Sequence, residues 1–186
     1  MTEDNLPSRS KINTHPDRAV SDDAWIIAFL KRAGMATIAT AQDEQPFLST
    51  LLFAYDEPTR VIYFHTARRG RVWENIHANP RVCLTAAEMG RLLPAATALN
   101  FSVEYNSVVV FGAAHLVENA VEAGHGLQLI LDKYFPHLHP GRDYRAITPE
   151  ELRITATYRL DIEEWSGKRK VVGEDFPGAF LWDEKL

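Results

Sequence analysis

The spacing of the apolar runs constrains this fold more than any other feature. Runs rich in β-branched and aromatic residues lie at 35–41, 46–55, 60–65, 81–87, 107–117 and 154–165. The last run alternates, with Ala156, Tyr158 and Leu160 on one side and Thr157 and Arg159 on the other, which predicts a strand with one wet face. Most connections are too short for βαβ crossovers, so we predict a mainly β protein whose antiparallel strands form a small barrel or sandwich.

Helical patterns interrupt these strands. Ser21 is expected to be the N-cap of a first helix, and Gly34 is a plausible stop. Its apolar face would hold Trp25, Ile26, Phe29 and Leu30.

Two more helices are predicted, at 69–77 and 118–135. Gly124 and Gly126 weaken the start of the second one, because glycine lowers helix propensity. The segments 135–148 and 88–100 are expected to be loops or connections, and the second is a plausible cleft lining.

Length and composition set the broad class. A chain of 186 residues that is 46% hydrophobic suits one domain at 21–170, with a flexible arm at 1–20 and a tail at 171–186. The net charge of -5 argues against a general nucleic-acid binder. The single cysteine, Cys83, excludes an intrachain disulfide and is expected to be a small buried residue. Without a signal-peptide or membrane-spanning pattern, the sequence predicts a soluble cytoplasmic protein with no membrane partner.

Positive charge gathers where one strand gives way to a helix, in "YFHTARRGRVWENI" at 63–76. The chain is acidic overall, so these three arginines are a local feature. Arginine offers forked hydrogen-bond donors, and a helix N-terminus adds free N–H groups and a partial positive charge. The pattern suits a phosphate group, and a solvated basic turn is the other interpretation.

The ordered set "GMATIATAQDEQPFLSTLLFAY", "YFHTARRGRVWENIHANPRVCLTA", "EYNSVVVFGAAHLVEN" and "LDIEEWSGKRK" resembles the pyridoxamine-phosphate-oxidase-like FMN-binding split-barrel superfamily. It looks most like the nitroimidazole-resistance (Nim-type) branch, and the resemblance covers roughly residues 24–170. It implies a six-stranded antiparallel split β-barrel that forms a homodimer, with FMN in clefts at the subunit interface.

The resemblance also implies the cofactor residues. A strand matching 48–53 runs beside the isoalloxazine in such families, which makes Ser49, Thr50, Leu51 and Leu52 candidates. The segment 65–71 matches the family's ribityl-phosphate segment. Arg71 is the first choice of phosphate ligand there, followed by Thr66, Arg68 and Arg69.

The remaining candidates each have a structural alternative. By resemblance His65 lies near the flavin, where it would orient a substrate or donate a proton; otherwise it only packs at the end of its strand. Tyr105, Asn106 and Ser107 would reach towards the partner's flavin, or begin an ordinary core strand. Trp165 would cover part of the cleft and Lys168 would approach the phosphate, or both would belong to a basic tail.

Departures from the family's sequence pattern argue against the activity of a true pyridoxamine-phosphate oxidase. Thr50 stands where Nim-type members often have proline, "QDEQP" replaces the usual Asp-Gly turn, and "WSGKRK" lacks the pyridoxal-binding signature of true pyridoxamine-phosphate oxidases. "PHLHPG" at 136–141 has two histidines without a third ligand, so no metal site is predicted.

We therefore expect an FMN-dependent oxidoreductase that passes electrons from a nicotinamide or reduced flavin to a small organic acceptor, of which a nitroaromatic is one candidate. One alternative is a non-catalytic flavin- or haem-binding protein on the same barrel, with His65 or His115 as the iron ligand. Another is a barrel without a cofactor that serves as a dimeric interaction module.

Overall fold

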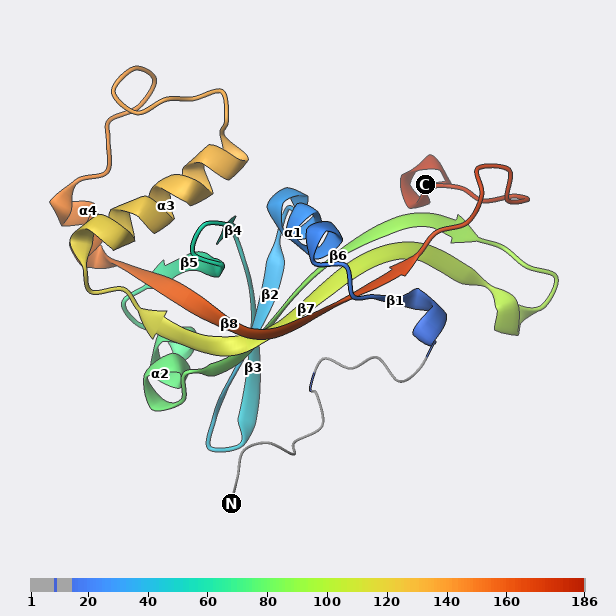
Figure 1. Cartoon of the computed structure of the whole chain (residues 1–186), viewed down its shortest axis with the longest axis horizontal. Coiled ribbons are helices and arrows are strands. Elements are labelled where there is room, and N and C mark those ends of the chain that lie inside the picture. The colour runs from blue at the N-terminus through green and yellow to red at the C-terminus, as the bar shows by residue number, and fades with distance from the viewer. Residues whose placement is uncertain (1–8, 10–14, 186) are drawn as a thin grey trace.

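An antiparallel sheet dominates the computed structural model, which describes Arg9 and residues 15–185 (Figure 1). Its strands are β1 (Ala19–Val20), β2 (Ala36–Gln42), β3 (Gln45–Leu51), β4 (Phe53–Asp56), β5 (Val61–Ala67), β6 (Arg81–Leu93), β7 (Ser102–Leu116) and β8 (Thr155–Lys170). The α-helices are α1 (Asp23–Arg32), α2 (Arg71–Ala78), α3 (Ala120–Tyr134) and α4 (Pro149–Ile154). Short 3-10 turns are η1 (Pro16–Arg18), η2 (Ala98–Asn100) and η3 (Trp182–Lys185). Among the described residues, every helix falls short of the length and apolar character needed to span a membrane.

The strand order defines the architecture of the sheet. The hydrogen-bonded order is β3-β2-β6-β7-β8-β5-β4, with β1 paired to β8, so β3 and β4 are the two ends of the sheet. Leu52 alone separates these two strands in the sequence, and the chain therefore bends from one end of the sheet to the other at that residue. The ladder itself stays unclosed. The expected count of six strands was wrong: the described residues form eight, because the run at 46–55 breaks at Leu52 and β1 was not predicted.

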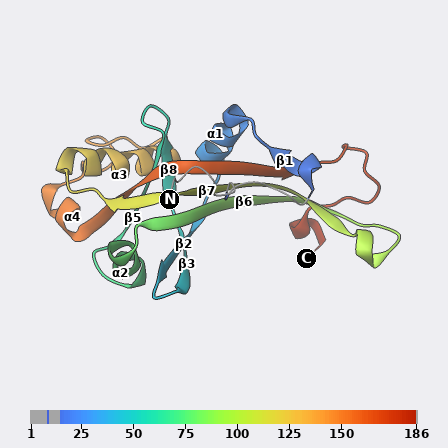
Figure 2. The ribbon, with the colours of Figure 1, turned by 60° about the horizontal axis from the view of Figure 1, so that its bottom comes forward.

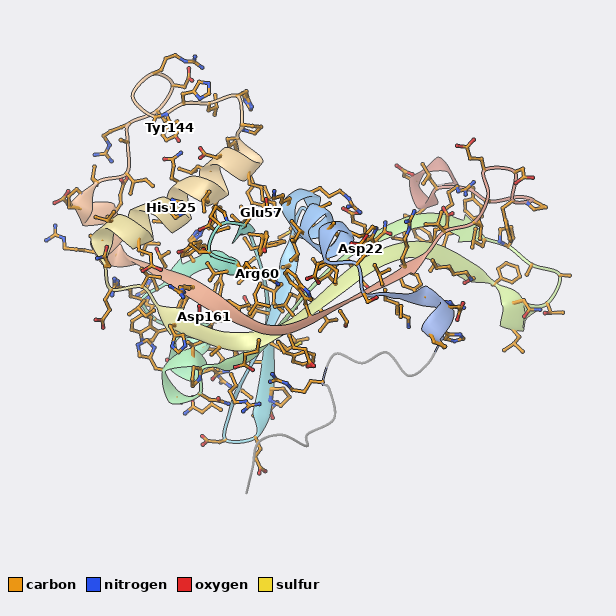
Figure 3. The ribbon with its side chains drawn as sticks, in the orientation of Figure 1. Asp22, Glu57, Arg60, His125, Tyr144 and Asp161 are labelled. Carbon is orange, nitrogen blue, oxygen red and sulfur yellow. The ribbon has the colours of Figure 1, made fainter. Side chains whose placement is uncertain are left out.

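The first helix covers the main core, as its sequence pattern predicts. Ile26, Phe29 and Leu30 are almost completely buried and pack with residues of the central strands. Its N-cap is Asp22 rather than the expected Ser21, because the Asp22 carboxylate accepts a hydrogen bond of 2.9 Å from the Ala24 amide (Figure 3). Cys83 is half-buried on β6 rather than fully buried, and that burial raises the pKa of its thiol.

The strands β6, β7 and β8 are longer than their apolar runs suggested, and they run across the whole molecule (Figure 2). The expected connection at 88–100 begins as strand, since β6 continues to Leu93. Similarly, "WSGKRK" is the end of β8 and not a tail. The arm expected at 1–20 falls largely outside the described residues, and its last two residues form β1 against β8.

A carboxylate fastens the C-terminal segment to the β6–β7 hairpin. Glu104 accepts hydrogen bonds from Arg91 Nε at 2.8 Å, from Arg91 Nη2 at 2.9 Å and from the Val172 amide at 2.8 Å. These bonds, those from Arg91 first, lower the pKa of Glu104 to about 2. The chain then returns along β6, where the Leu92 and Phe180 backbones pair.

This attachment should depend on pH. The folded pKa of Glu104 is depressed below its ordinary 4.5, so its contribution to stability is present above about pH 4.5 and is lost as the pH falls towards 2. We expect the C-terminal segment to become sensitive to an acid-active protease over that window, before the core unfolds. Limited proteolysis with pepsin, read by mass spectrometry, checks this, and Glu104→Gln should show the sensitivity already at pH 5. Equal cleavage of both proteins at pH 5 would contradict it.

Candidate functional site

The two faces of β5 separate His65 from Thr66. Val61 and Tyr63 pack with α3 residues, whereas Ile62 and Phe64 face the main core. Because side chains alternate along a strand, His65 lies on the α3 side. It is exposed, yet the surrounding protein lowers the pKa of its imidazole by desolvation, which favours the neutral ring at pH 7.

The loop after β5 leads into an uncapped helix. Gly70 precedes α2 with a φ of 98°, a conformation that glycine adopts without strain, and no side chain caps the first turn. Val72 and Ile76 are buried in the main core and hold the helix in place. The first N–H groups of α2 and the positive end of its dipole are therefore available to an anion.

The three arginines of this loop diverge. Arg68 reaches α4, where its Nη2 donates to the Leu152 carbonyl at 3.4 Å. The Arg71 guanidinium lies 5.8 Å from the centre of the Phe47 ring on β3. No ion pair involves Arg69 or Arg71 within the described part of the chain, so both remain available to an external anion.

Arg71 shares its surroundings with acidic side chains. A hollow of about 320 Å³ is lined by Arg71, Asp43, Glu74, Gln42 and Gln45. The two carboxylates outweigh the one guanidinium there, so a phosphate fits the loop side of Arg71 better than the floor of this hollow. Thr66 meanwhile donates its hydroxyl to the Ala67 carbonyl at 2.9 Å and retains only acceptor capacity.

The candidates on β3 lie at an edge of the sheet next to this loop. Thr50 is exposed and meets the Thr37 hydroxyl at 3.1 Å, while Ser49 is half-buried and Leu51 is buried. Phe53 pairs with Phe64, so Leu52 lies at the level of His65. Leu52 is thus linked to β5, and Phe47 of β3 is linked to Arg71, so we group the candidates 49–52, 65–66 and 68–71 under one name, the loop site.

The other candidates lie elsewhere in the same protomer. Tyr105, Asn106 and Ser107 pair with Lys170, Arg169 and Lys168 across β7 and β8. His65 pairs with Thr157 near the start of β8, and at about 3.3 Å per residue the strand carries Lys168 up to roughly 36 Å away. His65 and Lys168 therefore lie towards opposite ends of β8.

Trp165 belongs to neither group. Its Nε1 donates to Asp23 at the start of α1 at 2.8 Å, and Arg60 lies 5.2 Å from its ring centre. The indole packs against the main core beside Tyr55. Within this chain Trp165 joins α1 to the sheet.

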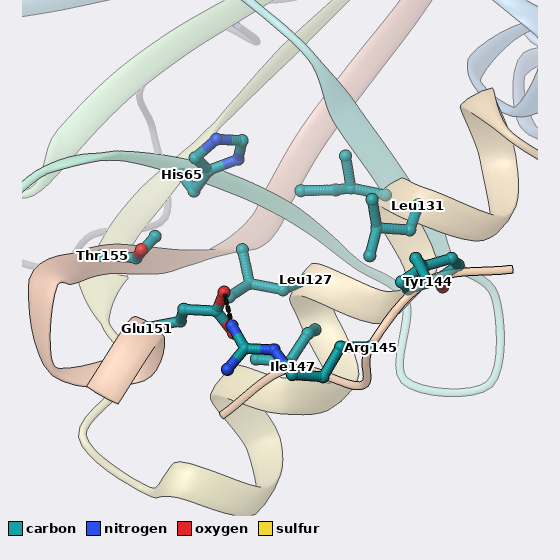
Figure 4. A pocket seen from close by; sticks show the side chains of 9 residues that line it. His65, Leu127, Leu131, Tyr144, Arg145, Ile147, Glu151 and Thr155 are labelled. Atoms are coloured by element: carbon teal, nitrogen blue, oxygen red, sulfur yellow. Dashed lines mark hydrogen bonds and ion pairs between the residues drawn. The ribbon is translucent and has the colours of Figure 1, made fainter. Parts of the chain in front are cut away.

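A pocket of about 340 Å³ opens beside His65 (Figure 4). Side chains from β5, α3, the loop at 144–147, α4 and β8 line it: His65, Leu127, Ile130, Leu131, Tyr144, Arg145, Ile147, Glu151 and Thr155. Sequence reasoning found His65 and missed the rest. The signal available was the "TPEE" stretch at 148–151, a capping box in which Thr148 and Glu151 bond each other's backbone N–H groups and begin α4.

A second hollow, of about 350 Å³, is lined by charged groups. Arg159 Nε donates to Asp161 Oδ1 at 2.6 Å, and His115 Nε2 lies 3.9 Å from Asp161 Oδ2. Glu122 takes part through Arg159 Nη1 at 3.5 Å and the Tyr63 hydroxyl at 3.1 Å. Arg159 is thus engaged by two carboxylates of this hollow, Glu122 and Asp161. Over the residues described, no group of three or more acidic, histidine or cysteine side chains is arranged to hold a metal ion.

Comparison with known families agrees with this architecture. A family model described as pyridoxamine 5'-phosphate oxidase matches residues 22–169, which is most of the chain. The chain belongs to this family. The resemblance inferred from the sequence is thereby confirmed, and the match runs from the N-cap of α1 to the penultimate residue of β8. No curated protein sequence matches the chain.

Members of the pyridoxamine 5'-phosphate oxidase family and related solved structures share the fold. The flavocytochrome Anf3 from Azotobacter vinelandii is 22% identical with a TM-score of 0.75, covering 92% of this chain and 81% of that one. The FAD and haem binding protein from Mycobacterium smegmatis is 20% identical with a TM-score of 0.74, covering 85% and 76%. A putative 5-nitroimidazole antibiotic resistance protein from Bacteroides thetaiotaomicron is 18% identical with a TM-score of 0.67, covering 81% and 86%.

Proposed function

We propose that this protein is a flavin-dependent oxidoreductase that binds FMN at the loop site. The observation that carries the proposal is the uncapped N-terminus of α2 directly beside two arginines without carboxylate partners in the described residues. A phosphate suits this donor set, because backbone N–H groups, a helix dipole and guanidinium groups all favour an anion. Family membership and the flavin-binding names of structural neighbours support a flavin as the molecule that carries it.

The chain's own residues would divide the work. Arg71 and Arg69 would hold the phosphate, and the β3 backbone at 49–52 would run along the flavin ring. His65 would orient an acceptor from the α3 side. When bound, the flavin supplies the electron transfer from a nicotinamide or reduced flavin to a small organic acceptor, of which a nitroaromatic is one candidate.

The proposal includes a homodimer. Tyr105–Ser107 and Lys168 lie at the opposite end of β8 from the partner of His65, and a second copy could place its Tyr105–Ser107 beside the flavin of this one, as the family resemblance implies. The far end of the β6–β7 hairpin also exposes Leu99 and Phe101, a composition that protein interfaces favour. Light scattering on the purified protein checks this, and a monomer at micromolar concentration would contradict it.

Titration of the flavin-free protein with FMN tests the function. Saturable quenching of flavin fluorescence at micromolar or lower concentration, followed by faster reoxidation of the reduced complex when an acceptor is added, is the expected result. Parallel titration with FAD shows whether the site admits the adenylate half. The absence of binding by either flavin would reject the proposal.

Haem binding is the second candidate, because one structural neighbour is named an FAD and haem binding protein and another a flavocytochrome. In this chain the choice between the two histidines favours His65, which lies beside an apolar pocket, over His115, which lies among charged groups. A Soret band in the spectrum after haem addition, lost in His65→Ala, would support it.

A further inference from the structure

We propose that the pocket beside His65, walled by α3 and the loop at 144–147, binds an uncharged aromatic molecule, which under the proposed function is the electron acceptor. The pocket lies on the α3 side of β5, and the loop site occupies the end of the same strand. A molecule held there would reach the loop site without crossing the barrel core. That the bound molecule is an electron acceptor rests on the proposed function, whereas its binding in the pocket does not.

The lining selects for an apolar ring. Leu127, Ile130 and Leu131 line the pocket from α3, and Ile147 lines it from the loop at 144–147. Ile130 is buried, but the other three side chains are partly accessible to water. An aromatic ring placed among them would therefore remove apolar surface from water. The volume of about 340 Å³ is at the small end of ligand pockets, which run from about 300 to 1,000 Å³.

The charges of the lining select against an anion. Arg145 is the only cation among the lining residues, and its Nη2 donates to Glu151 Oε1 at 2.9 Å (Figure 4). Both side chains lie at the exposed rim. Because one is a cation and the other an anion, the pair has no net charge, and the floor of the pocket has no free positive charge among its lining residues. A carboxylate on the ligand would therefore lose its water without gaining an ion pair.

The polar groups that remain match one hydrogen-bonding substituent. His65 lies across the pocket from the Arg145–Glu151 pair, and Thr155 and Tyr144 add hydroxyls at its edge (Figure 4). A neutral imidazole has one N–H donor and one acceptor nitrogen. The pocket thus fits an apolar ring with a carbonyl, ester or similar uncharged group turned towards His65.

Two probes with the same ring test this selection. Methyl 2-naphthoate and 2-naphthoate differ mainly in charge, and both are titrated into the flavin-free full chain while the Leu and Ile methyl groups and the His65 ring are followed by NMR. We expect the ester to shift the signals of Leu127, Leu131 and His65, and the carboxylate to bind at least tenfold more weakly. Equal or tighter binding of the carboxylate would overturn the proposal.

Matched variants locate the site. Leu127→Glu should weaken binding of the ester at least tenfold, whereas Val121→Glu, which puts the same charge on an exposed position of α3, should leave it unchanged. Ile147→Glu repeats the test from the loop, in case the helix variant fails to fold. Unchanged binding in both pocket variants would overturn the proposal.

The flavin titration keeps the two proposals separate. Binding of the ester without binding of FMN or FAD would leave the pocket standing and remove the oxidoreductase. Binding of FMN with no response to the ester would do the opposite.

Discussion

Gly112→Ala should destabilise the protein by about 3 kcal/mol or more, which is at the upper end of the cost of overpacking. A Cβ atom at Gly112 would lie 2.0 Å from the Asp161 carbonyl oxygen and 2.9 Å from Leu160 Cδ1. The first neighbour is backbone in the adjacent strand, so no side-chain rotation relieves the contact. The register of β7 against β8 also shifts between Phe111 and Gly112, where a bulge brings the two strands close together. Urea denaturation followed by tryptophan fluorescence measures the effect.

Gly124→Ala is the matched control, because it makes the same substitution with nothing within 4 Å of the new atom. It lies inside α3, where alanine is preferred over glycine by about 0.5–1 kcal/mol, so the midpoint should rise. Both variants are compared at one protein concentration, since an oligomer's stability depends on it. A midpoint for Gly112→Ala within experimental error of the wild type would show that the strands can separate at low cost, contrary to our expectation.

The glycines of α3 show how far local reasoning reaches. Propensity alone makes Gly126 a weakness of the helix, yet a Cβ there would lie 2.6 Å from the Tyr63 ring on β5. The residue is small because α3 must approach that strand closely, and only the tertiary structure reveals this. The helix itself was predictable from the periodicity of its leucine and isoleucine residues, as were α1 and the apolar parts of the strands other than β1.

The strand ends were less predictable. At the ends of β6 and β8, the conformation is decided by pairing with neighbouring strands and not by the pattern of side chains. The stretch 166–170 carries Gly167 and three basic residues, and it is strand because β7 and β1 pair with it on both sides. The break at Leu52 is equally non-local, since it arises where one strand leaves β2 and joins β5.

The candidate site was predictable only where it depends on local sequence. Residues close together in sequence, such as His65 and Arg71, lie at the end of β5 and the start of α2, as the strand-to-helix pattern predicts. The segment 144–155 was read as loop up to 148 and strand from 154, and its contribution to the His65 pocket depends on how it folds back over α3. Nothing in the periodicity of that segment indicates which strand it will cover. The capping box of α4 locates the helix but not its neighbours.

Replacing Arg71 by alanine should weaken FMN binding about tenfold to a hundredfold. A hydrogen bond to a charged group contributes about 1.5–3 kcal/mol, and each 1.4 kcal/mol is a factor of ten in affinity. The variant also leaves Asp43 and Glu74 without the guanidinium that shares their hollow, which adds repulsion towards a phosphate. Stability should change little, since Arg71 is exposed and contacts only the Phe47 ring among its described interactions. Flavin fluorescence titration and a urea denaturation curve measure the two quantities.

Riboflavin separates the phosphate from the ring. It lacks the phosphate group, so Arg71→Ala should leave its affinity unchanged while FMN weakens, and Arg71→Lys should retain part of the FMN affinity because it keeps the charge without the fork. Arg142→Ala, a change at an exposed arginine paired with Asp143 in another loop, is the matched control and should bind FMN as the wild type does. If Arg71→Ala weakened both ligands equally, Arg71 would shape the ring site. If it weakened neither, the phosphate would depend on Arg69 and the α2 N–H groups. Arg68 and Arg71 would then keep their contacts with Leu152 and Phe47 when the flavin is bound.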